Sequence, residues 1–211
     1  MRKIVTRLHV RAISPASRHG RLEAGGLVFP CLLGRNGITA RKREGDGGSP
    51  LGLWRLCRVL FRRDRALPPA TALPVAPLAR RDGWCDEAGD RNYNRPVRLP
   101  YPASHEELWR LDHLYDVVVV LDHNVRPRRR GGGSAIFFHL SAPEGATTAG
   151  CIAVQPGHMR IILGHCGPST SLAIGVSGRA LPRKSPNRPV HGWRRPRSPP
   201  ENRRSSPSRG R

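Results

Sequence analysis

The sequence predicts a mainly β protein, either a sandwich or an irregular barrel, with one or two short helices. Three observations support this class. The apolar runs are short, only one segment has a helical apolar pattern, and turn-forming residues separate the runs, with 23 Gly and 21 Pro among 211 residues. Short strands joined by frequent turns bury their apolar faces as packed or closed sheets.

Each expected strand follows from a local pattern of apolar residues. Residues 5–13 alternate weakly, and residues 27–33 run from a glycine pair into a turn. Residues 53–60 alternate in part, with Arg55 and Arg58 on the outer face. The remaining strands are expected at 117–121, 135–139, 151–154 and 171–176.

The segments between these runs are expected to be loops and short helices. A polar loop with four glycines spans 42–52, an extended connection spans 62–82, and a flexible basic loop spans 126–133. Polar, aromatic-bearing loops are expected at 83–86 and 92–96, and a short helical turn at 106–110. Residues 158–163 have the pattern of a short amphipathic helix, which Gly164 and Gly167 help to end.

The charge is strongly positive, with 37 Lys and Arg against 15 Asp and Glu and a net charge of +22. We expect an N-terminal strand and lead-in over 1–25, one domain over 26–176, and a disordered basic tail rich in Arg, Pro and Ser over 177–211. The tail is interpreted as structureless rather than as a nucleic-acid-binding arm, because no aromatic residues alternate with its arginines. The charge as a whole favours association with polyanions and anionic surfaces.

The five cysteines form no CxxC pair and no Cys/His spacing typical of zinc, so no metal site is expected. Cys31, Cys57 and Cys166 are expected in the core. The first residues are too polar for a signal peptide, and no run approaches the roughly 20 apolar residues of a transmembrane helix. We therefore expect a soluble chain without a visible leader.

One segment has the pattern of a nucleophilic site. An apolar run delivers His139, a loop of small residues follows, and Thr148-Ala149-Gly150-Cys151 begins another apolar run. The thiolate is the reactive form of cysteine, and a histidine on a neighbouring strand can act as its base. The alternative is that Cys151 is an ordinary buried thiol and His139 an unremarkable residue at a strand end.

These residues resemble the L,D-transpeptidase (YkuD-type) catalytic domain. The likeness rests on the Gly150-Cys151 motif, on the strand that ends at His139, and on the segment from Lys42 to Trp54, in which Ser49-Pro50-Leu51-Gly52 enters a strand. It implies a YkuD-like fold over 26–176 that acts on peptidoglycan stem peptides with no cofactor. Cys151 would attack the L-centre carbonyl of a diamino acid, expel D-alanine and form a thioester that the amine of a second stem resolves.

The resemblance also implies roles for the neighbouring residues. His139 would be the base, the backbone carbonyl of Leu140 would orient it, and the N–H groups around Ala149, Gly150 and Cys151, after Thr148, would form an oxyanion site. The chain departs from the common family pattern at several places, and the interval between His139 and Cys151 is short. Leu140 replaces a glycine, Thr148-Ala149 replaces Ser-His, and Ala153 stands where an arginine is often found.

Substrate contacts are expected from the polar loops. Trp84, Tyr93 and Asn94 are candidates for a cleft wall, with turn chemistry as the alternative, and Arg160 or Arg95 could replace the missing arginine. His158 and His165 are interpreted as exposed helix residues. A peptidoglycan substrate places the protein in the periplasm or at the cell surface, with no specific nucleic-acid partner. The alternatives are an L,D-carboxypeptidase that uses the same site, or a non-catalytic basic protein that binds peptidoglycan or nucleic acid.

Overall fold

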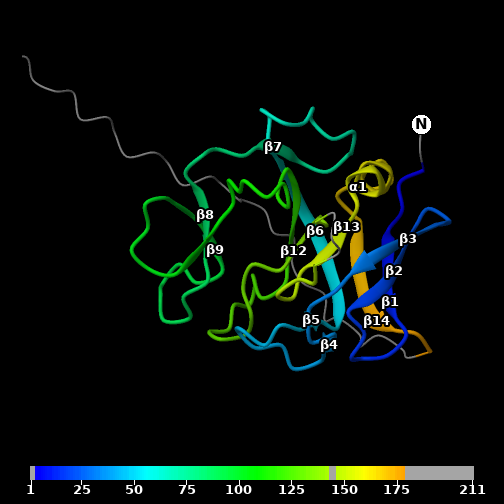
Figure 1. Ribbon diagram of the computed structural model, residues 1–211, viewed down its shortest axis with the longest axis horizontal. Coiled ribbons are helices and arrows are strands. Elements are labelled where there is room, and N and C mark those ends of the chain that lie inside the picture. Colours follow the sequence, from blue (N-terminus) through cyan, green and yellow to red (C-terminus); the bar gives the residue numbers. More distant parts are fainter. Residues whose placement is uncertain (1–2, 143–145, 179–211) are drawn as a thin grey trace, which may run out of the picture.

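A computed structural model describes residues 3–142 and 146–178 (Figure 1). Most of its strands belong to one large sheet, in the order β11-β12-β13-β3-β2-β1-β14-β6-β7, and β11 also pairs with β6. The second pairing closes the sheet into a barrel. The strands of this sheet are β1 (Arg7–Ala12), β2 (His19–Ala24), β3 (Leu27–Leu32), β6 (Gly52–Phe61), β7 (Val75–Pro77), β11 (Val117–Leu121), β12 (Phe137–Leu140), β13 (Ile152–Val154) and β14 (Ser171–Val176).

The length of β6 makes the closure possible. Its first half pairs with β14, where Trp54 lies opposite Leu172, and its second half pairs with β11, where Leu60 lies opposite Val118. Closing the sheet in this way removes exposed strand edges, which would otherwise pair with other chains.

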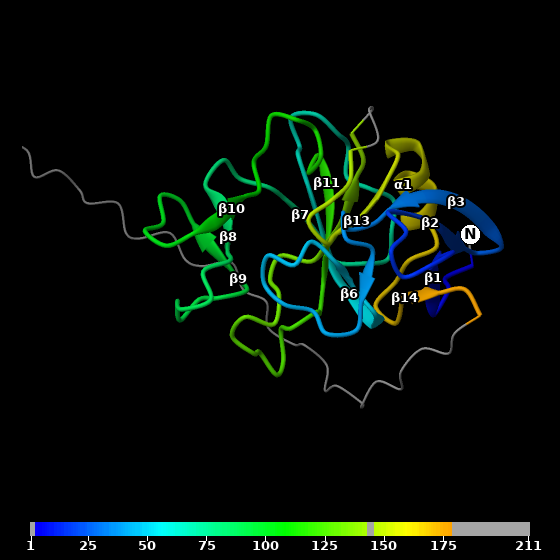
Figure 2. The same cartoon turned by 60° about the horizontal axis from the view of Figure 1, so that its bottom comes forward.

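Two smaller sheets flank the barrel. A three-stranded sheet, in the order β10-β8-β9, contains β8 (Asp82–Cys85), β9 (Arg95–Arg98) and β10 (His105–Glu107). Figure 2 shows this sheet on the side of β11 that faces away from β1, β2 and α1. A pair of two-residue strands, β4 (Ile38–Thr39) and β5 (Ser49–Pro50), brackets the polar loop that contains Lys42.

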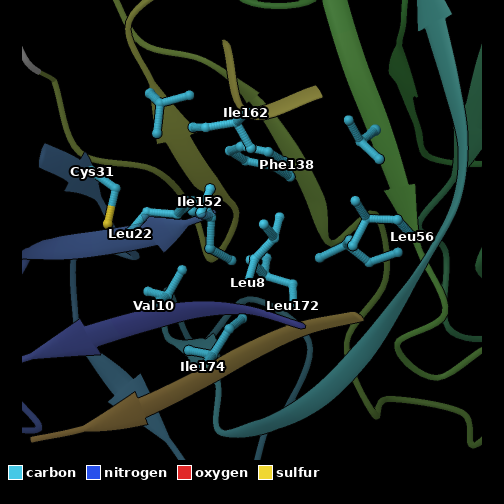
Figure 3. Close-up of a cluster of buried hydrophobic side chains, with 14 of the residues drawn as sticks. Leu8, Val10, Leu22, Cys31, Leu56, Phe138, Ile152, Ile162, Leu172 and Ile174 are labelled. Atoms are coloured by element: carbon cyan, nitrogen blue, oxygen red, sulfur yellow. The ribbon is translucent and has the colours of Figure 1, made fainter. Parts of the chain in front are cut away.

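Two apolar clusters pack on opposite faces of β11 and β12. The first lies within the barrel and includes Phe138, Ile152 and Ile162, the last from helix α1 (Pro156–Leu163) (Figure 3). The second contains Val118, Phe137 and Cys151 together with Trp84 and Leu108 of the flanking segments. Alternate residues of a strand face opposite sides of the sheet, so β12 contributes Phe138 to one cluster and Phe137 to the other.

The mainly β class is confirmed, and the expected strands lie where the apolar runs predicted them, within one or two residues. The expected helical turn at 106–110 is wrong, because His105–Glu107 forms β10 and pairs with β8. The expected loop at 83–86 is largely β8, whereas that at 92–96 is a turn over 92–94 that leads into β9, and the expected connection at 62–82 contains β7. Short strands with polar residues leave no clear period in a sequence.

The N-terminal segment is part of the same barrel. β1 pairs with both β14 and β2. β2 pairs with β3, so strand pairing joins the expected lead-in over 1–25 to the segment that follows it. Of the expected tail, residues 179–211 lie outside the described residues. Within the described residues, no helix has the length and apolar character needed to span a bilayer.

Candidate active site

Cys151 lies directly before β13 and faces the second apolar cluster. Because β12 and β13 are parallel with Phe138 opposite Ile152, Cys151 lies opposite Phe137. The backbone N–H of Phe137 donates to Cys151 Sγ at 3.3 Å, and Sγ donates to the carbonyl oxygen of Ala135 at 3.2 Å. The thiol is 7% exposed and lines a cavity of about 880 Å³.

His139 lines the same cavity, from the same face of β12 as Phe137. Its Nδ1 lies 2.8 Å from the carbonyl oxygen of Leu140. A carbonyl oxygen can only accept, so Nδ1 carries the proton and Nε2 keeps a lone pair. The backbone N–H of Leu140 donates to the carbonyl oxygen of Leu114 at 3.1 Å, and the ring of Tyr115 packs edge-on against the imidazole at 5.1 Å. The imidazole is thus fixed in a tautomer that can accept a proton.

Burial keeps both members of the pair neutral. It lowers the pKa of His139 from 6.5 to about 4, and it raises the pKa of the Cys151 thiol from 9.0 to about 12. Near neutral pH the site therefore holds an uncharged imidazole and a protonated thiol. For this thiol to act as a nucleophile, a base would have to take its proton.

The loop before Cys151 is fixed by hydrogen bonds. The Thr148 hydroxyl donates to the carbonyl oxygen of Cys151 at 2.7 Å and accepts from the N–H of Gly150 at 3.2 Å. The hydroxyl of Ser49, which is fully buried, donates to the same Cys151 carbonyl at 3.4 Å. The N–H of Gly150 therefore points at Thr148, although we expected it to contribute to an oxyanion site. Ala149 lines the cavity.

Gly150 cannot be replaced at this position without strain. Its φ is +141°, and a Cβ built on it would lie 2.9 Å from the carbonyl oxygen of Gly48. This close approach joins the 148–151 loop to the polar loop between β4 and β5. The resemblance pointed to both segments, and the fold brings them into contact.

The cavity is also lined by charged side chains. The hydroxyl of Tyr115 donates to Glu106 of β10, and the guanidinium of Arg110 lies 4.0 Å from the same carboxylate. Burial is the main cause of a raised pKa at Glu106 and of a much higher pKa at Tyr115. Glu106 and Tyr115 were not expected in the site, because the segment around Glu106 was expected to be helical.

Trp84, Tyr93 and Asn94 are buried behind the cavity wall and do not line the cavity. Asn94 accepts from Trp84 Nε1 at 2.9 Å and from the backbone N–H of Ala135 at 3.2 Å. Its own amide donates to the carbonyl oxygens of His123 and Asn124. The placement differs from the substrate contact expected of these residues. Asn94 instead holds the backbone of Ala135, whose carbonyl oxygen accepts a hydrogen bond from the Cys151 thiol.

The expected arginine substitutes also lie away from the cavity. Arg160 is an exposed residue of α1, and Arg95 is exposed on β9; neither lines the cavity. His158 and His165 are half-buried: the ring of His158 packs against Phe29 at 5.0 Å, and His165 Nδ1 lies 3.1 Å from the carbonyl oxygen of Lys3. Among the described residues, no group of His, Cys, Asp or Glu side chains could hold a metal ion.

The remaining cysteines lie in or beside the core. Cys31, Cys85 and Cys166 are buried and Cys57 is half-buried, so the expectation of a core position holds fully for Cys31 and Cys166 and in part for Cys57. Burial raises the pKa of Cys31 and of Cys166 to about 12. Of the five, only Cys151 lines the cavity with a histidine.

The comparison with known families agrees with this geometry. The model of the L,D-transpeptidase catalytic domain (YkuD) matches residues 10–174, from β1 to β14 and most of the chain. No curated protein and no solved structure matches. The matched range contains Cys151, His139 and the polar loop between β4 and β5. The chain belongs to the L,D-transpeptidase catalytic domain (YkuD) family.

Proposed function

We propose that the protein is a cysteine acyltransferase that acts on peptidoglycan stem peptides by L,D-transpeptidation. The observation that carries the proposal is that Cys151 and a correctly tautomerised His139 line one cavity of about 880 Å³, in a chain of this family. A cavity of this size accommodates several peptide residues.

The first half-reaction forms a thioester. His139 Nε2 takes the thiol proton as Cys151 Sγ attacks the L-centre carbonyl of the diamino acid in a tetrapeptide stem, and the carbonyl electron pair moves to oxygen. As the tetrahedral intermediate collapses, the C–N bond to D-alanine breaks and the imidazolium returns its proton to the leaving amine. Sulfur holds the acyl group, and the histidine is again neutral.

The second half-reaction consumes the thioester. The amine of a second stem attacks the acyl carbon, gives its proton to His139, and displaces the Cys151 thiolate, which is then reprotonated. The product is an amide cross-link. If water attacks instead, the product is a shortened stem, which is the carboxypeptidase outcome.

The depressed pKa of His139 suits this sequence of steps. An imidazole with a pKa of about 4 is neutral at neutral pH, so its Nε2 lone pair is free, although its basicity is lower than that of an exposed histidine. Once protonated beside the leaving nitrogen, it is a strong acid and returns the proton readily.

Turnover on purified disaccharide-tetrapeptides tests the proposal, with released D-alanine and muropeptide products measured by chromatography. We expect D-alanine release and cross-linked dimers from the wild type, and neither from Cys151→Ala. Cys57→Ala, which removes the half-buried thiol of β6, is the matched control and should retain turnover. Cross-linking by Cys151→Ala would contradict the proposal, and shortened monomers alone would assign the hydrolase.

A further inference from the structure

The active site has an electrostatic problem that the Cys–His pair does not solve. The attack creates negative charge first on sulfur and then on the substrate oxygen, inside a buried site. Burial is the main cause of the raised pKa of Cys151, and the charge of Glu106, which also lines the cavity, raises it further. The N–H of Gly150, which could have faced that charge, points at Thr148.

Lys42 brings a positive charge to this place. Its side chain is only 7% exposed and it lines the cavity with Cys151 and His139. A Cβ built on Gly150 would lie 3.3 Å from Lys42 Nζ, which puts the ammonium group beside the residue that precedes the nucleophile.

The chain makes room for this side chain with two glycines. A Cβ built on Gly133 would lie 2.8 Å from Lys42 Cγ and 3.0 Å from Cε, so the stem passes directly over that residue. Both Gly133, with φ of +86°, and Gly150, with φ of +141°, have backbone conformations that favour glycine. A side chain at either position would therefore crowd the Lys42 side chain in its present position.

Asp46 holds Lys42 in place but binds only part of its ammonium group. Lys42 Nζ donates to Asp46 Oδ1, which also accepts from the N–H of Gly48 at 2.9 Å, while Oδ2 accepts from the N–H of Arg43 at 2.8 Å. The Asp46 carboxylate is shared among three donors, and an ammonium group has three N–H bonds of which this pair uses one.

We propose that Lys42 supplies the positive charge of the active site, and that it stabilises the Cys151 thiolate and the oxyanion formed when sulfur adds to the substrate carbonyl. The second part rests on the proposed acyl transfer, whereas the first does not. Several charged and titratable groups line the cavity with Cys151: Lys42 and Glu44 in the polar loop, Asp86, His105, Glu106 and Glu107 in and beside β8 and β10, Arg110, Asp112 and Tyr115 before β11, and His139 of β12.

Lys42 and Arg110 are the cations among these groups. The Arg110 guanidinium donates to Asp112 at 3.0 Å and lies 4.0 Å from Glu106, whereas the cation that acts on the thiol is Lys42. Its charge lowers the pKa of Cys151, against the larger effect of burial and the opposite effect of Glu106. The Glu44 carboxylate is already engaged by the hydroxyls of Tyr93 and Ser134, and that contact ties the polar loop to the wall beside Ala135.

A purely structural role for the Lys42–Asp46 pair predicts a different response to mutation. If the pair only holds the loop, removing either partner should disturb the site in the same direction. If Lys42 acts by its charge, removing Lys42 should raise the pKa of Cys151 and removing Asp46 should lower it. The two substitutions then change thiol reactivity in opposite directions.

The test is the rate of Cys151 alkylation by iodoacetamide at pH 8, followed by mass spectrometry of the full chain and its Cys151 peptide. We expect Lys42→Met to slow alkylation by roughly tenfold and Asp46→Asn to speed it a few-fold, as a nearby charge in a partly buried site requires. Lys42→Arg keeps the charge and should lie near the wild type. Arg43→Met removes an exposed charge next along the chain and is the matched control, with a change of less than about twofold.

A second arm separates the thiolate from the oxyanion. Alkylation forms no oxyanion, whereas acylation by a carbapenem does, so Lys42→Met should slow acylation by a further factor of about ten beyond its effect on alkylation. An equal effect on both reactions would overturn the oxyanion part of the inference.

An unchanged alkylation rate in Lys42→Met, or slower alkylation in both Lys42→Met and Asp46→Asn, would overturn the thiolate part. If Lys42→Met does not fold, Asp46→Asn decides the matter by the sign of its effect. Alkylation requires no stem peptide, so these outcomes are independent of the turnover assay that tests the proposed function.

Discussion

The strongest prediction concerns how acylation of Cys151 depends on pH between 7 and 5. The perturbation is acid alone, applied to the unmodified protein with a carbapenem at saturating concentration. Since the pKa of the Cys151 thiol is about 12, the thiol stays protonated throughout this range. The rate is then expected to follow the state of His139, with Glu106, whose pKa is raised, as the other cavity group that can take up a proton.

The expected magnitude follows from the depressed pKa of His139. With a pKa of about 4, roughly nine in ten of these imidazoles are still neutral at pH 5. The acylation rate at pH 5 should therefore be lower than the rate at pH 7 by no more than about a fifth. An imidazole with the ordinary pKa of 6.5 would be almost fully protonated at pH 5, and the rate would fall about 25-fold.

The assay is stopped-flow or quenched-flow acylation, with the adduct on Cys151 quantified by mass spectrometry. His139→Gln is the reference variant: it should react roughly a hundredfold more slowly, and its rate should fall about tenfold per pH unit because it depends on rare free thiolate. A wild-type rate that falls about 25-fold between pH 7 and pH 5 would refute the buried, neutral base. A fall of about a hundredfold would remove His139 from the proton transfer altogether.

Three further predictions concern stability. Because the folded-state pKa of His139 is depressed, the unfolded chain binds the extra proton as the pH falls. The stability that His139 contributes is therefore full above pH 6.5 and is lost toward pH 4. In urea unfolding at pH 7 and pH 5, the wild type should lose about 2 kcal/mol more than His139→Gln, and equal losses would contradict the burial. Gly150→Ala should cost roughly 1–3 kcal/mol from its positive φ and its contact with the Gly48 carbonyl, whereas Gly157→Ala in α1, where a Cβ meets nothing, should cost nothing measurable. Asn94→Ala should lower the free energy of unfolding by about 2–4 kcal/mol and slow acylation, because Trp84 and Ala135 lose a buried hydrogen-bond partner. Urea titration should show a smaller loss of stability for Asn92→Ala, and equal losses would contradict the supporting role of Asn94.

The sequence predicted the fold where apolar runs are long enough to show a period. The run at 117–121 and the paired runs around His139 and Cys151 gave β11, β12 and β13, and the glycine before Cys151 marked a tight approach of two backbones. These signals are local, because a strand buried on both faces must be apolar throughout.

The parts that the sequence did not reveal depend on contacts between distant segments. Glu106 belongs to a three-residue strand whose partner is β8, and no pattern within the segment distinguishes it from a helical turn. Asn94 and Tyr93 have the polar, aromatic character of a binding loop, yet they turn inward because Trp84 and Glu44 supply partners there.

Lys42 illustrates the same limit for charge. In the sequence it is one of 37 basic residues, in a glycine-rich loop far from Cys151. The pairing of β13 with β3 and the bridge between Gly34 and Thr148 bring the two loops together and place its ammonium group beside Gly150.

The central claim is that one thiol, Cys151, becomes acylated with His139 as its base. The most direct measurement is the intact mass of the protein after incubation with a disaccharide-tetrapeptide or a carbapenem, followed by identification of the modified peptide. The account predicts a single acyl adduct on Cys151 that Cys151→Ala abolishes and Cys166→Ala, which removes another buried thiol, leaves intact. An adduct on any other residue, or none with a correctly folded protein, would contradict it.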